Sequence, residues 1–564
     1  MAAGSKVETI KRQSRGLRGT IAATLAADTT HFINGDEQLL KFHGVYQGYD
    51  RDSATELKQQ GREKAHEFMV RAKIPAGQLT AAQYLALDDL AERHGGRNLR
   101  VTTRQGIQFH GVVKGDLKAT IAGINATLLT TLAACGDVVR NVTATPAPIA
   151  DNVHRTLQRE AALLSAALAP KTRGYHEIWV DGEPYENGGD ETDALYGETY
   201  LPRKFKIGLA APEDNSIDVL TNDLALIALF DGDALQGYNI AVGGGLGMTH
   251  NKPKTYPRLA TPVVFVPPAD LLDTVKAVIT MQRDHGDRAD RKHARLKYLV
   301  DEKGLDWVKA QIEERVGHPL EAARPMPRFR IVDHMGWHAQ GDGRVYLGLP
   351  IANGRIKDTD QVKLRSALRQ ILRETGARPI LMPTQDILLA DLAIDDREKV
   401  DGILKAHGVA LPMDLTPVVR WAMACPALPT CGLALNEAER IRVPLVEAIE
   451  QALARHGLRN ERISIRITGC PNGCARPYAG DIGIVGRTPD SYAIYLGGDF
   501  EGTRLNRLVF ERVKLDDIAA TLEPLFAFFA GARRKGESFG DFCHRHEPAV
   551  LADIAARATR PAVA

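Results

Sequence analysis

Four of the six cysteines lie in two short groups in the C-terminal third of the chain. Cys425 and Cys431 enclose Pro-Ala-Leu-Pro-Thr, and Cys470 and Cys474 enclose Pro-Asn-Gly. Thiolates at such spacings bind metals, and the prolines and glycine between them let the backbone turn and direct N–H groups toward sulfur. The set favours a four-cysteine iron–sulfur cluster. Structural zinc and unligated core thiols are the alternatives, although zinc sites usually use pairs two residues apart.

The two other cysteines, Cys135 and Cys543, have no partner nearby in the sequence and are expected to be buried structural thiols. Six cysteines among 564 residues are too few for a disulfide scaffold, which indicates a reducing compartment. The N-terminus lacks the apolar segment of a secretory signal, and the longest apolar runs, such as 525–532, fall short of the roughly 18 residues of a membrane span. We therefore expect a cytoplasmic protein without a membrane segment.

Basic residues recur among apolar neighbours in stretches that resemble strands. They are Arg71, Lys73, Arg100, Arg104, Arg140, Arg203, Lys204 and Lys206. Charges in such settings are costly unless paired, so an anion with several carboxylates or a small oxyanion would stabilise them. The alternative is that each faces solvent from a half-buried strand. A further basic segment, residues 286–297, is interpreted as a solvent-facing surface.

The composition excludes several classes of protein. Hydrophobic residues make up 44% of the chain and charged residues 25%, as in folded globular proteins, and the length predicts several domains. The net charge of +2 gives no overall basic field, so we expect no nucleic-acid partner. The glycine-rich run at 242–247 lacks the flanking strand, helix and acidic residue of a dinucleotide loop. Electrons for a redox centre on this chain would therefore come from another protein.

One unit of predicted secondary structure recurs about half a chain later. Its first copy has strands at 68–74, 98–104 and 106–112 and a capped helix between Thr80 and Gly95, and its second has a strand at 345–349 and a helix between Asp358 and Gly376. Residues 77–79 match 354–356 at an offset of 277, and residues 103–105 match 384–386 at an offset of 281. A repeat this long indicates a duplicated domain. We predict an α+β, multi-domain fold with βαβ-containing halves related by pseudo-two-fold symmetry, with a site between them.

Several motifs carry a resemblance to a known family. They are Leu40-Lys-Phe-His-Gly44, Phe68-Met-Val-Arg71, the run Arg-Val-Thr-Thr-Arg-Gln-Gly-Ile-Gln-Phe-His at 100–110, Arg140-Asn-Val142, Leu201-Pro-Arg-Lys-Phe-Lys206, Ser538-Phe-Gly-Asp-Phe542 and both cysteine pairs. Together they resemble the sirohaem sulfite and nitrite reductases, and within them the haemoprotein beta subunits of assimilatory sulfite reductase. The resemblance runs almost from end to end.

The resemblance implies sirohaem and a [4Fe-4S] cluster at the centre of the fold. The implied cluster ligands are Cys425, Cys431, Cys470 and Cys474. Cys474 would also bridge to the haem iron. The implied substrate-binding residues are Arg71, Arg140, Lys204 and Lys206, and the residues implied to hold or flank the macrocycle are Arg100, Arg104, Gln108, His110 and Asn472. Sirohaem carries many carboxylates, which agrees with the buried basic residues.

The resemblance also implies an activity: the six-electron reduction of sulfite to sulfide in sulfur assimilation and cysteine biosynthesis. The implied electron donor is an NADPH-dependent flavoprotein subunit that carries FMN and FAD. Ferredoxin-dependent sulfite reduction and ferredoxin-dependent nitrite reduction are the close alternatives, and Lys204 with Lys206 favours sulfite. A zinc-bound scaffold protein whose basic residues bind an acidic partner is the alternative from another class.

The resemblance and the repeat together predict five segments. We expect an extended N-terminal arm at 1–62, a first ferredoxin-like half repeat at 63–150, and a first sirohaem-reductase domain with the substrate-binding lysine loop at 151–330. A second ferredoxin-like half repeat at 331–415 and a second sirohaem-reductase domain with the four cysteines at 416–564 would complete the chain.

Overall fold

The fold mixes helices and sheets in two similar halves, which confirms the predicted α+β class. The computed structural model describes residues 4–33, 35–172, 174–175, 179–180, 183–184 and 193–559. None of the helices in this part of the chain combines the length and the apolar character that crossing a membrane requires. The described strands form four large sheets and one small hairpin of β6 (Trp179–Val180) and β7 (Glu183–Pro184).

The two smaller of the large sheets are antiparallel and have matching strand orders. The first runs β1 (Val45–Tyr49), β2 (His66–Ala72), β4 (Ile107–Val112), β3 (Leu99–Val101), β15 (Arg355–Ile356). The second runs β13 (Gly336–Ala339), β14 (Val345–Leu349), β17 (Ile387–Leu392), β16 (Arg378–Leu381). Their helices are α5 (Ala81–His94), α6 (Leu117–Ala126), α11 (Leu364–Thr375) and α12 (Asp396–Ala406). One hydrophobic core joins both sheets.

The two larger sheets also match each other. One runs β5 (Thr143–Ala144), β8 (Ile207–Ala210), β9 (Leu224–Asp231), β10 (Ala234–Val242), β11 (Thr261–Val266), β12 (Glu321–Ala322). The other runs β18 (Ala422–Ala424), β19 (Ile465–Thr468), β20 (Ile482–Thr488), β21 (Ser491–Leu496), β22 (Arg507–Lys514). In each, the first three strands named are parallel and the later ones antiparallel. Each sheet therefore repeats the other's topology.

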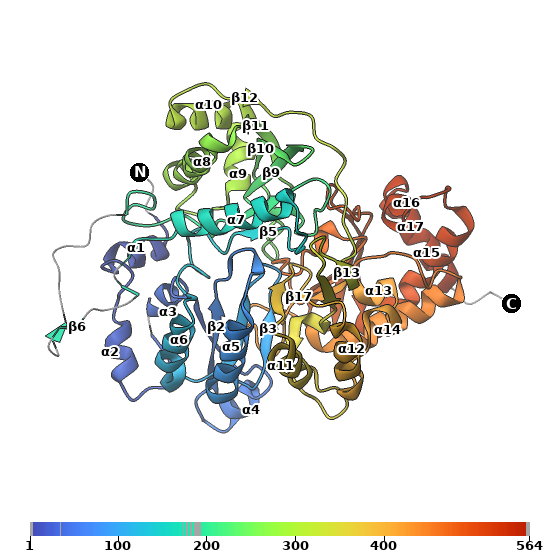
Figure 1. Ribbon diagram of the computed structural model, residues 1–564, viewed down its shortest axis with the longest axis horizontal. Helices are drawn as coiled ribbons and strands as arrows, with labels where there is room; N and C mark the ends of the chain where they lie inside the picture. Colours follow the sequence, from blue (N-terminus) through green and yellow to red (C-terminus); the bar gives the residue numbers. More distant parts are fainter. Residues whose placement is uncertain are drawn as a thin grey trace.

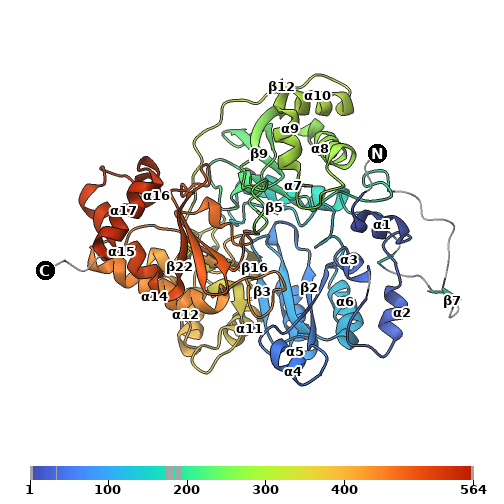
Figure 2. The same cartoon turned by 180° about the vertical axis from the view of Figure 1, so that it is seen from behind.

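Helices flank these larger sheets in corresponding places. Beside the first are α7 (Asn152–Ala167), α8 (Leu271–His285), α9 (Leu296–Lys303) and α10 (Leu305–Val316), and beside the second are α13 (Pro417–Arg420), α14 (Glu439–Arg455), α15 (Ile518–Ala532), α16 (Phe539–Arg545) and α17 (Pro548–Thr559). The segment with α8 to α10, in green, lies above the blue first small sheet, and the segment with α14 to α17, in orange and red, lies at one side (Figures 1 and 2). The C-terminal helices are far from the N-terminus in both views.

The two halves exchange short segments, which ties them together. Strand β15 of the second half pairs with β3 of the first, with Arg355 opposite Arg100. Reciprocally, Gln78 of the first half forms a bridge with Ile380 in β16. Because each half completes the other's sheet edge, the pair cannot separate without breaking backbone hydrogen bonds.

Two glutamines confirm the duplication and correct its predicted register. The Gln105 amide donates to the carbonyl oxygens of Ala76 (3.1 Å) and Ala144 (3.0 Å). The Gln385 amide donates in the same way to Asn353 (3.3 Å) and Ala424 (2.9 Å). Gln105 therefore corresponds to Gln385 at an offset of 280, and the predicted offset of 281 for this loop was wrong. The offset of 277 is confirmed, because Ala76 corresponds to Asn353 and both have positive φ.

Local signals in the sequence predicted some helix ends and not others. Helix α5 begins after a capping box between Thr80 and Gln83 and ends at Gly95, as predicted. Helix α11 ends at Gly376 in the left-handed conformation, but it begins at Leu364 instead of after Asp358. The Asp358 carboxylate instead accepts hydrogen bonds from the backbone N–H and hydroxyl of Ser366.

The N-terminal segment differs from the predicted extended arm. It contains four short helices, α1 (Lys6–Gln13), α2 (Ile21–Ala26), α3 (Asp36–Leu40) and α4 (Ala54–Gln59). Strand β1 lies within it and forms the edge of the first small sheet, in antiparallel register with β2. The arm therefore belongs to the folded body of the first half. The predicted segment boundaries at residues 62, 150, 330 and 415 stay predictions.

Replacing Gly354 by alanine should weaken the pairing of β15 with β3, which joins the two halves. A Cβ at this position would lie 2.2 Å from the carbonyl oxygen of Val101, and the residue has φ of +69°. We expect Gly354→Ala to lower the free energy of unfolding by about 2–3 kcal/mol, because both a clash and a strained backbone are introduced. Thermal unfolding of the variant measures the loss.

Gly402 provides the matched control. It lies inside α12, and a Cβ there meets nothing within 4 Å. Gly402→Ala should raise stability by up to about 1 kcal/mol because alanine is the better helix former. Equal unfolding temperatures for Gly354→Ala and the parent protein would contradict the importance of the exchange.

Candidate cofactor and anion site

A row of polar side chains crosses four neighbouring strands of the first small sheet. Arg71 in β2 lies opposite Gln108 in β4, Gln108 lies opposite Arg100 in β3, and Arg100 lies opposite Arg355 in β15. Directly opposed residues project from the same face of a sheet. The row therefore presents three guanidinium groups and one amide on one face. The second half contributes Arg355, which the sequence analysis did not identify.

This row is fixed by hydrogen bonds to the second half of the chain. The Arg100 guanidinium donates to Gln108 Oε1 (3.3 Å) and to the carbonyl oxygen of Ala424 (2.9 Å), the residue before Cys425. Glu439 binds Arg355 through two hydrogen bonds of 2.7 and 2.9 Å, and its Oε2 lies 3.5 Å from Arg100 Nε. The cationic row thus lies beside the first cysteine loop.

His110 lies at the same face and is held neutral. Burial lowers the pKa of His110 well below its ordinary value, and Arg355 and Arg100 lower it further. Its Nε2 is 3.4 Å from Gln108 Oε1, and its Nδ1 is buried without a hydrogen-bond partner. A neutral imidazole with a free ring nitrogen can bind a polar group of a ligand.

Arg104 is held rigidly in the loop between β3 and β4. Its guanidinium donates to Asn222 Oδ1 (2.7 Å) and to the carbonyl oxygens of Asn141 (2.5 Å) and Ile207 (3.0 Å). Its Nε is buried without a partner. Burial, followed by the nearby Arg140, lowers the pKa of Arg104 to about 9. The loop therefore fixes a guanidinium that still has one unpaired donor.

Two lysines lie beside these arginines. Burial, with Arg203 and Arg295 nearby, lowers the pKa of Lys204 to about 7. Burial, with Arg104 and Lys204 nearby, lowers the pKa of Lys206 well below its ordinary value. Both lysines are half-buried and lie near other cations, so positive charge is crowded at this place.

The crowded charge is only partly neutralised by the protein. Asp223 faces the lysines, but Arg295 already binds both its carboxylate oxygens at 2.8 Å. Arg140 donates to the carbonyl oxygens of Gly136 (2.8 Å) and Ala134 (3.3 Å), which carry no full charge. An anionic ligand would stabilise the group.

The four predicted cysteines come together in the second half. Burial raises the pKa of Cys425 well above its ordinary value, and the other three thiols raise it further, Cys474 most of the three. Burial and Cys474 raise the pKa of Cys470 to about 12. The backbone N–H of Gly469 donates to Cys425 Sγ at 3.3 Å. Cys425 and Cys470 are buried, Cys431 is half-buried and Cys474 is exposed.

The spacing of the sulfurs is too wide for one zinc ion. Around tetrahedral zinc, with Zn–S bonds of about 2.3 Å, all four sulfurs lie within about 4 Å of one another. Among the residues that the structure describes, no three cysteine sulfurs lie mutually within 4.8 Å. The thiols therefore fit a larger group such as a [4Fe-4S] cluster, whose positive irons would also keep them ionised.

Cys474 connects the cysteine set to the cationic site. Its thiolate opposes the burial-driven lowering of the pKa of both Lys204 and Arg100, so its sulfur lies within electrostatic reach of both. Its carbonyl oxygen accepts a hydrogen bond from Thr103 Oγ1 (3.0 Å), in the loop that carries Arg104.

The residues present fit an anionic tetrapyrrole beside the cysteines. Arg71 Nε, Arg104 Nε and His110 Nδ1 are buried without hydrogen-bond partners. Such atoms are costly in an empty core. The two guanidinium N–H groups would be satisfied by a ligand that accepts hydrogen bonds, and His110 Nδ1, an acceptor when Nε2 donates to Gln108, by a ligand group that donates one. The predicted site residues of both halves thus come together, while their individual roles stay predictions.

The glycine-rich run at 242–247 forms a support for the second cysteine loop. A Cβ on Gly247 would lie 3.1 Å from the carbonyl oxygen of Asn472, and the N–H of Met248 donates to Pro471 (2.9 Å). Lys297 Nζ donates to the carbonyl oxygens of Gly245 and Gly247, both at 2.9 Å. This close approach gives the glycines a structural role that the sequence analysis missed.

The interpretation of residues 286–297 as a solvent-facing surface was wrong. Arg295 and Lys297 are buried, and Arg291 binds both carboxylate oxygens of Asp137. The physical reason is that buried carboxylates pair with Arg291 and Arg295, and backbone carbonyls of another element accept hydrogen bonds from Lys297. The apolar residues at 294, 296, 299 and 300 were the signal that this segment enters the core.

The two remaining cysteines are buried, as predicted. Cys135 and Cys543 both have no solvent exposure and carry free thiols. Cys543 belongs to the core of the second half, where burial raises the pKa of its thiol well above the ordinary value. It has the environment of a structural residue.

Replacing a cysteine of the set should remove iron, whereas replacing Cys543 should not. We expect Cys425→Ser to lose most of its iron and acid-labile sulfide, because one of four thiolate ligands is gone. Cys543→Ala should keep both and lose only about 1–2 kcal/mol of stability from the small cavity. Iron and sulfide analysis of the purified proteins measures the difference. Unchanged iron in Cys425→Ser would contradict the ligand assignment.

Comparison with known proteins agrees with this geometry. Residues 60–127 match the nitrite/sulfite reductase ferredoxin-like half domain, and residues 160–320 match the nitrite and sulphite reductase 4Fe-4S domain. The second match covers β8 to β11 of the first of the two large sheets, whereas the cysteines lie beside the second.

Full-length relatives are similar over nearly the whole chain. The sulfite reductase [NADPH] hemoprotein beta-component of Myxococcus xanthus is 46% identical over 97% of this chain and 98% of its own. The sulfite reductase [ferredoxin] of Synechococcus elongatus is 44% identical over 96% of this chain and 89% of its own. The structure of Mycobacterium tuberculosis NirA has the same fold, with a TM-score of 0.79 at 22% identity over 97% of this chain and 98% of its own. The chain therefore belongs to the sulfite reductase haemoproteins, oxidoreductases of the nitrite and sulfite reductase family that bind sirohaem and a [4Fe-4S] cluster.

Proposed function

We propose that this protein reduces sulfite to sulfide with six electrons, at a sirohaem whose iron shares the Cys474 thiolate with a [4Fe-4S] cluster. One observation carries the proposal: the loop of Cys474, which lies near the other cysteines and near Lys204 and Arg100, is hydrogen-bonded through Thr103 (3.0 Å) to the loop that carries Arg104. A thiolate in that place can join an electron store to an anion site. When bound, the two groups supply electrons one at a time to the substrate.

The protein residues bind the substrate and supply its protons. Sulfite is an oxyanion, and Arg71 and Arg140 would hold its oxygens through forked N–H donors. Arg71 Nε has no other hydrogen-bond partner. Lys204 and Lys206 would hold protons at Nζ and release them as oxygens leave as water, since their lowered pKa values favour proton release.

A second set would hold the macrocycle. Arg100 and Arg104 would pair with its carboxylates, Gln108 would donate a hydrogen bond, and His110 would flank the ring. Asn472 would line the haem side of the second cysteine loop, whose backbone the glycine at 247 supports. These residues would orient the cofactor and exclude water from its buried side.

The relatives leave the physiological electron donor open. One relative is named for NADPH and another for ferredoxin, and their sequences are 46% and 44% identical to this chain. We propose an NADPH-dependent flavoprotein subunit, in sulfur assimilation and cysteine biosynthesis, with ferredoxin as the alternative. We also propose that the protein works in the cytoplasm, since six cysteines among 564 residues are too few for a disulfide scaffold.

Turnover of the purified, cofactor-loaded protein tests the proposal. With a reduced viologen as donor, the rates on sulfite and on nitrite should show the higher specificity constant for sulfite. Much faster use of nitrite at low concentration would make nitrite reduction the function. Sulfide production with purified flavoprotein and with purified ferredoxin then identifies the donor, and a higher rate with ferredoxin would overturn the flavoprotein proposal.

The pH dependence of sulfite binding tests the role of Lys204. Its pKa is lowered to about 7, so the free site loses this positive charge as pH rises through that region. A bound anion favours the charged form, so binding takes up a proton and weakens as pH rises. We expect the KM for sulfite to rise up to about tenfold for each pH unit above the pKa of Lys204 in the loaded protein.

Lys204→Arg and Lys204→Met form the matched pair for this test. Arginine stays protonated, so Lys204→Arg should keep a low KM to higher pH, whereas Lys204→Met should have a high KM at every pH. The ionisation of sulfite itself is common to all three proteins and cancels in the ratios. Identical pH profiles for the parent protein and both variants would exclude Lys204 from the substrate site.

A further inference from the structure

The loop that carries Cys474 has a structural twin in the first half. Strand pairs β8–β9 and β19–β20 have the same registers at a constant offset of 258, with Ile207 opposite Leu224 and Ile465 opposite Ile482. The two connecting loops contain short helical turns at corresponding places, Val219–Thr221 and Pro477–Ala479. In this correspondence Ser216 takes the place of Cys474.

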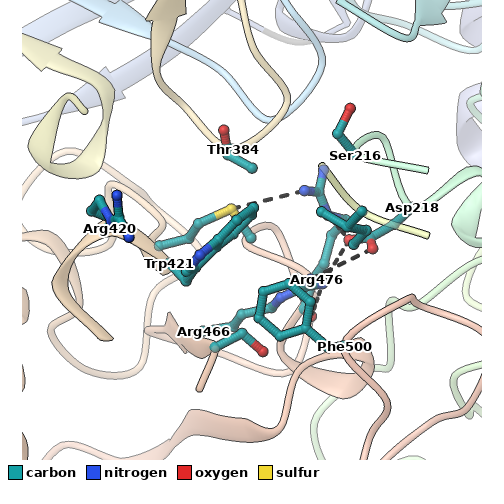
Figure 3. Close-up of a pocket in the computed structure, with 11 residues that line it drawn as sticks. Ser216, Asp218, Thr384, Arg420, Trp421, Arg466, Arg476 and Phe500 are labelled. Carbon is teal, nitrogen blue, oxygen red and sulfur yellow. Dashed lines mark hydrogen bonds and ion pairs between the residues drawn. The ribbon is translucent and has the colours of Figure 1, made fainter. Parts of the chain in front are cut away.

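Asp218 and Arg476 are the equivalent residues of the two loops, and they pair with each other. Both have left-handed backbone conformations, with φ of 49° and 54°. Arg476 Nε lies 2.6 Å from Asp218 Oδ2, and both side chains are more than nine-tenths buried. The ion pair therefore joins equivalent positions of the two halves and lies close to the pseudo-two-fold axis. Figure 3 shows it, with Arg466 beside it.

Arg476 also holds the loop between β3 and β4. Its Nη1 donates to the carbonyl oxygen of Thr103 (3.2 Å), and Thr103 Oγ1 donates to the carbonyl oxygen of Cys474 (3.0 Å). The contacts form a chain: Asp218 binds Arg476, Arg476 binds Thr103, and Thr103 binds Cys474. Arg104, the next residue, is fixed at the same time.

Arg466 offers a contrast within the same cluster. Its Nη1 lies 2.6 Å from Asp218 Oδ2, and it is as buried as Arg476. Its guanidinium donates to Asp218 and to the backbone of Arg476, and among the described residues it makes no hydrogen bond to Thr103. One carboxylate therefore binds two arginines, of which Arg476 contacts the loop that carries Arg104.

The surroundings of the ion pair between Asp218 and Arg476 are closely packed. The cavity there, lined by Ser216, Arg420, Trp421 and Phe500 among others, has room for about one water molecule. Trp421 and Phe500 pack edge to face, with ring centroids 4.9 Å apart. Little space is left for the pair to shift, so its geometry is well defined.

We propose that Asp218 and Arg476 are positioning residues that hold the Cys474 thiolate in place against the cationic site. The proposal rests on the proposed function, because it takes Cys474 as the shared ligand. Asp218 belongs to the first half and Arg476 to the second. Their ion pair therefore makes the position of the Cys474 sulfur, which both cofactors would share, depend on how the two halves are aligned. A displacement of a fraction of an ångström at this place changes the electronic contact between the groups and the rate.

Paired arginine variants of the cofactor-loaded protein test the proposal. Arg476→Met and Arg466→Met each remove one buried guanidinium from Asp218, and only Arg476→Met breaks the contact with Thr103. We expect Arg476→Met to lower kcat with a viologen donor by about tenfold to a hundredfold and to change the electron paramagnetic resonance spectrum of the reduced protein. Arg466→Met should stay within about twofold in kcat and keep the parent spectrum.

Thr103 variants keep the test decisive if Arg476→Met fails to fold or to bind cofactor. Thr103→Val removes the hydroxyl that binds Cys474 and leaves the ion pair intact, and Thr103→Ser restores the hydroxyl. We expect a reduced rate and an altered spectrum in Thr103→Val and recovery of both in Thr103→Ser.

Equal losses in Arg476→Met and Arg466→Met, or parent-like spectra in both Arg476→Met and Thr103→Val, would overturn the positioning role. Failure of the proposed function would look different, because the parent protein itself would then lack sirohaem, iron and sulfite reduction.

Discussion

Half-buried positive charge, which the protein neutralises only in part, dominates the energetics of the site. Lys204, Lys206 and Arg104 lie together with lowered pKa values, and the carboxylate that faces them, Asp223, is already bound by Arg295. A chain that buries such a group without its ligand loses stability. On the proposed assignment, the anionic cofactor and substrate would contribute to folding as well as to catalysis, and iron would stabilise the four thiols in the same way.

Duplication supplies the scaffold that brings these two kinds of site together. Neither half holds both: the lysines and Arg104 come from the first, and the cysteines come from the second. Exchange of Gln78 and β15 between the halves, and the ion pair between Asp218 and Arg476, fix their relative position. The same symmetry places Ser216 where the other half has Cys474, so one of the two equivalent loops carries the sulfur.

Local signals in the sequence predicted the elements and most of the chemistry. The capping box at Thr80, the glycines at 95 and 376, and the spacing of the cysteines each depend on a few neighbouring residues, and each matches the structure. The basic residues among apolar neighbours were recognisable because a buried cation is costly unless a counter-charge or a ligand pairs with it.

Contacts between residues far apart in the sequence were not predicted. Arg355 joins the cationic row through pairing between the halves, and no local pattern indicates that pairing. Lys297 looked solvent-facing because its partners, the carbonyls of Gly245 and Gly247, lie about fifty positions away. The start of α11 and the one-residue register error at Gln385 arose from turns whose geometry the sequence does not specify uniquely.

The shared ligand proposed here is the Cys474 thiolate, between an iron–sulfur cluster and a haem iron at a cationic site. Mössbauer spectroscopy of the natively prepared, iron-isotope-enriched protein detects such a link. We expect the haem iron and the cluster irons to behave as one magnetically coupled system, and Cys474→Ser to abolish the coupling. Independent haem and cluster signals in the parent protein, or protein free of iron, would contradict it.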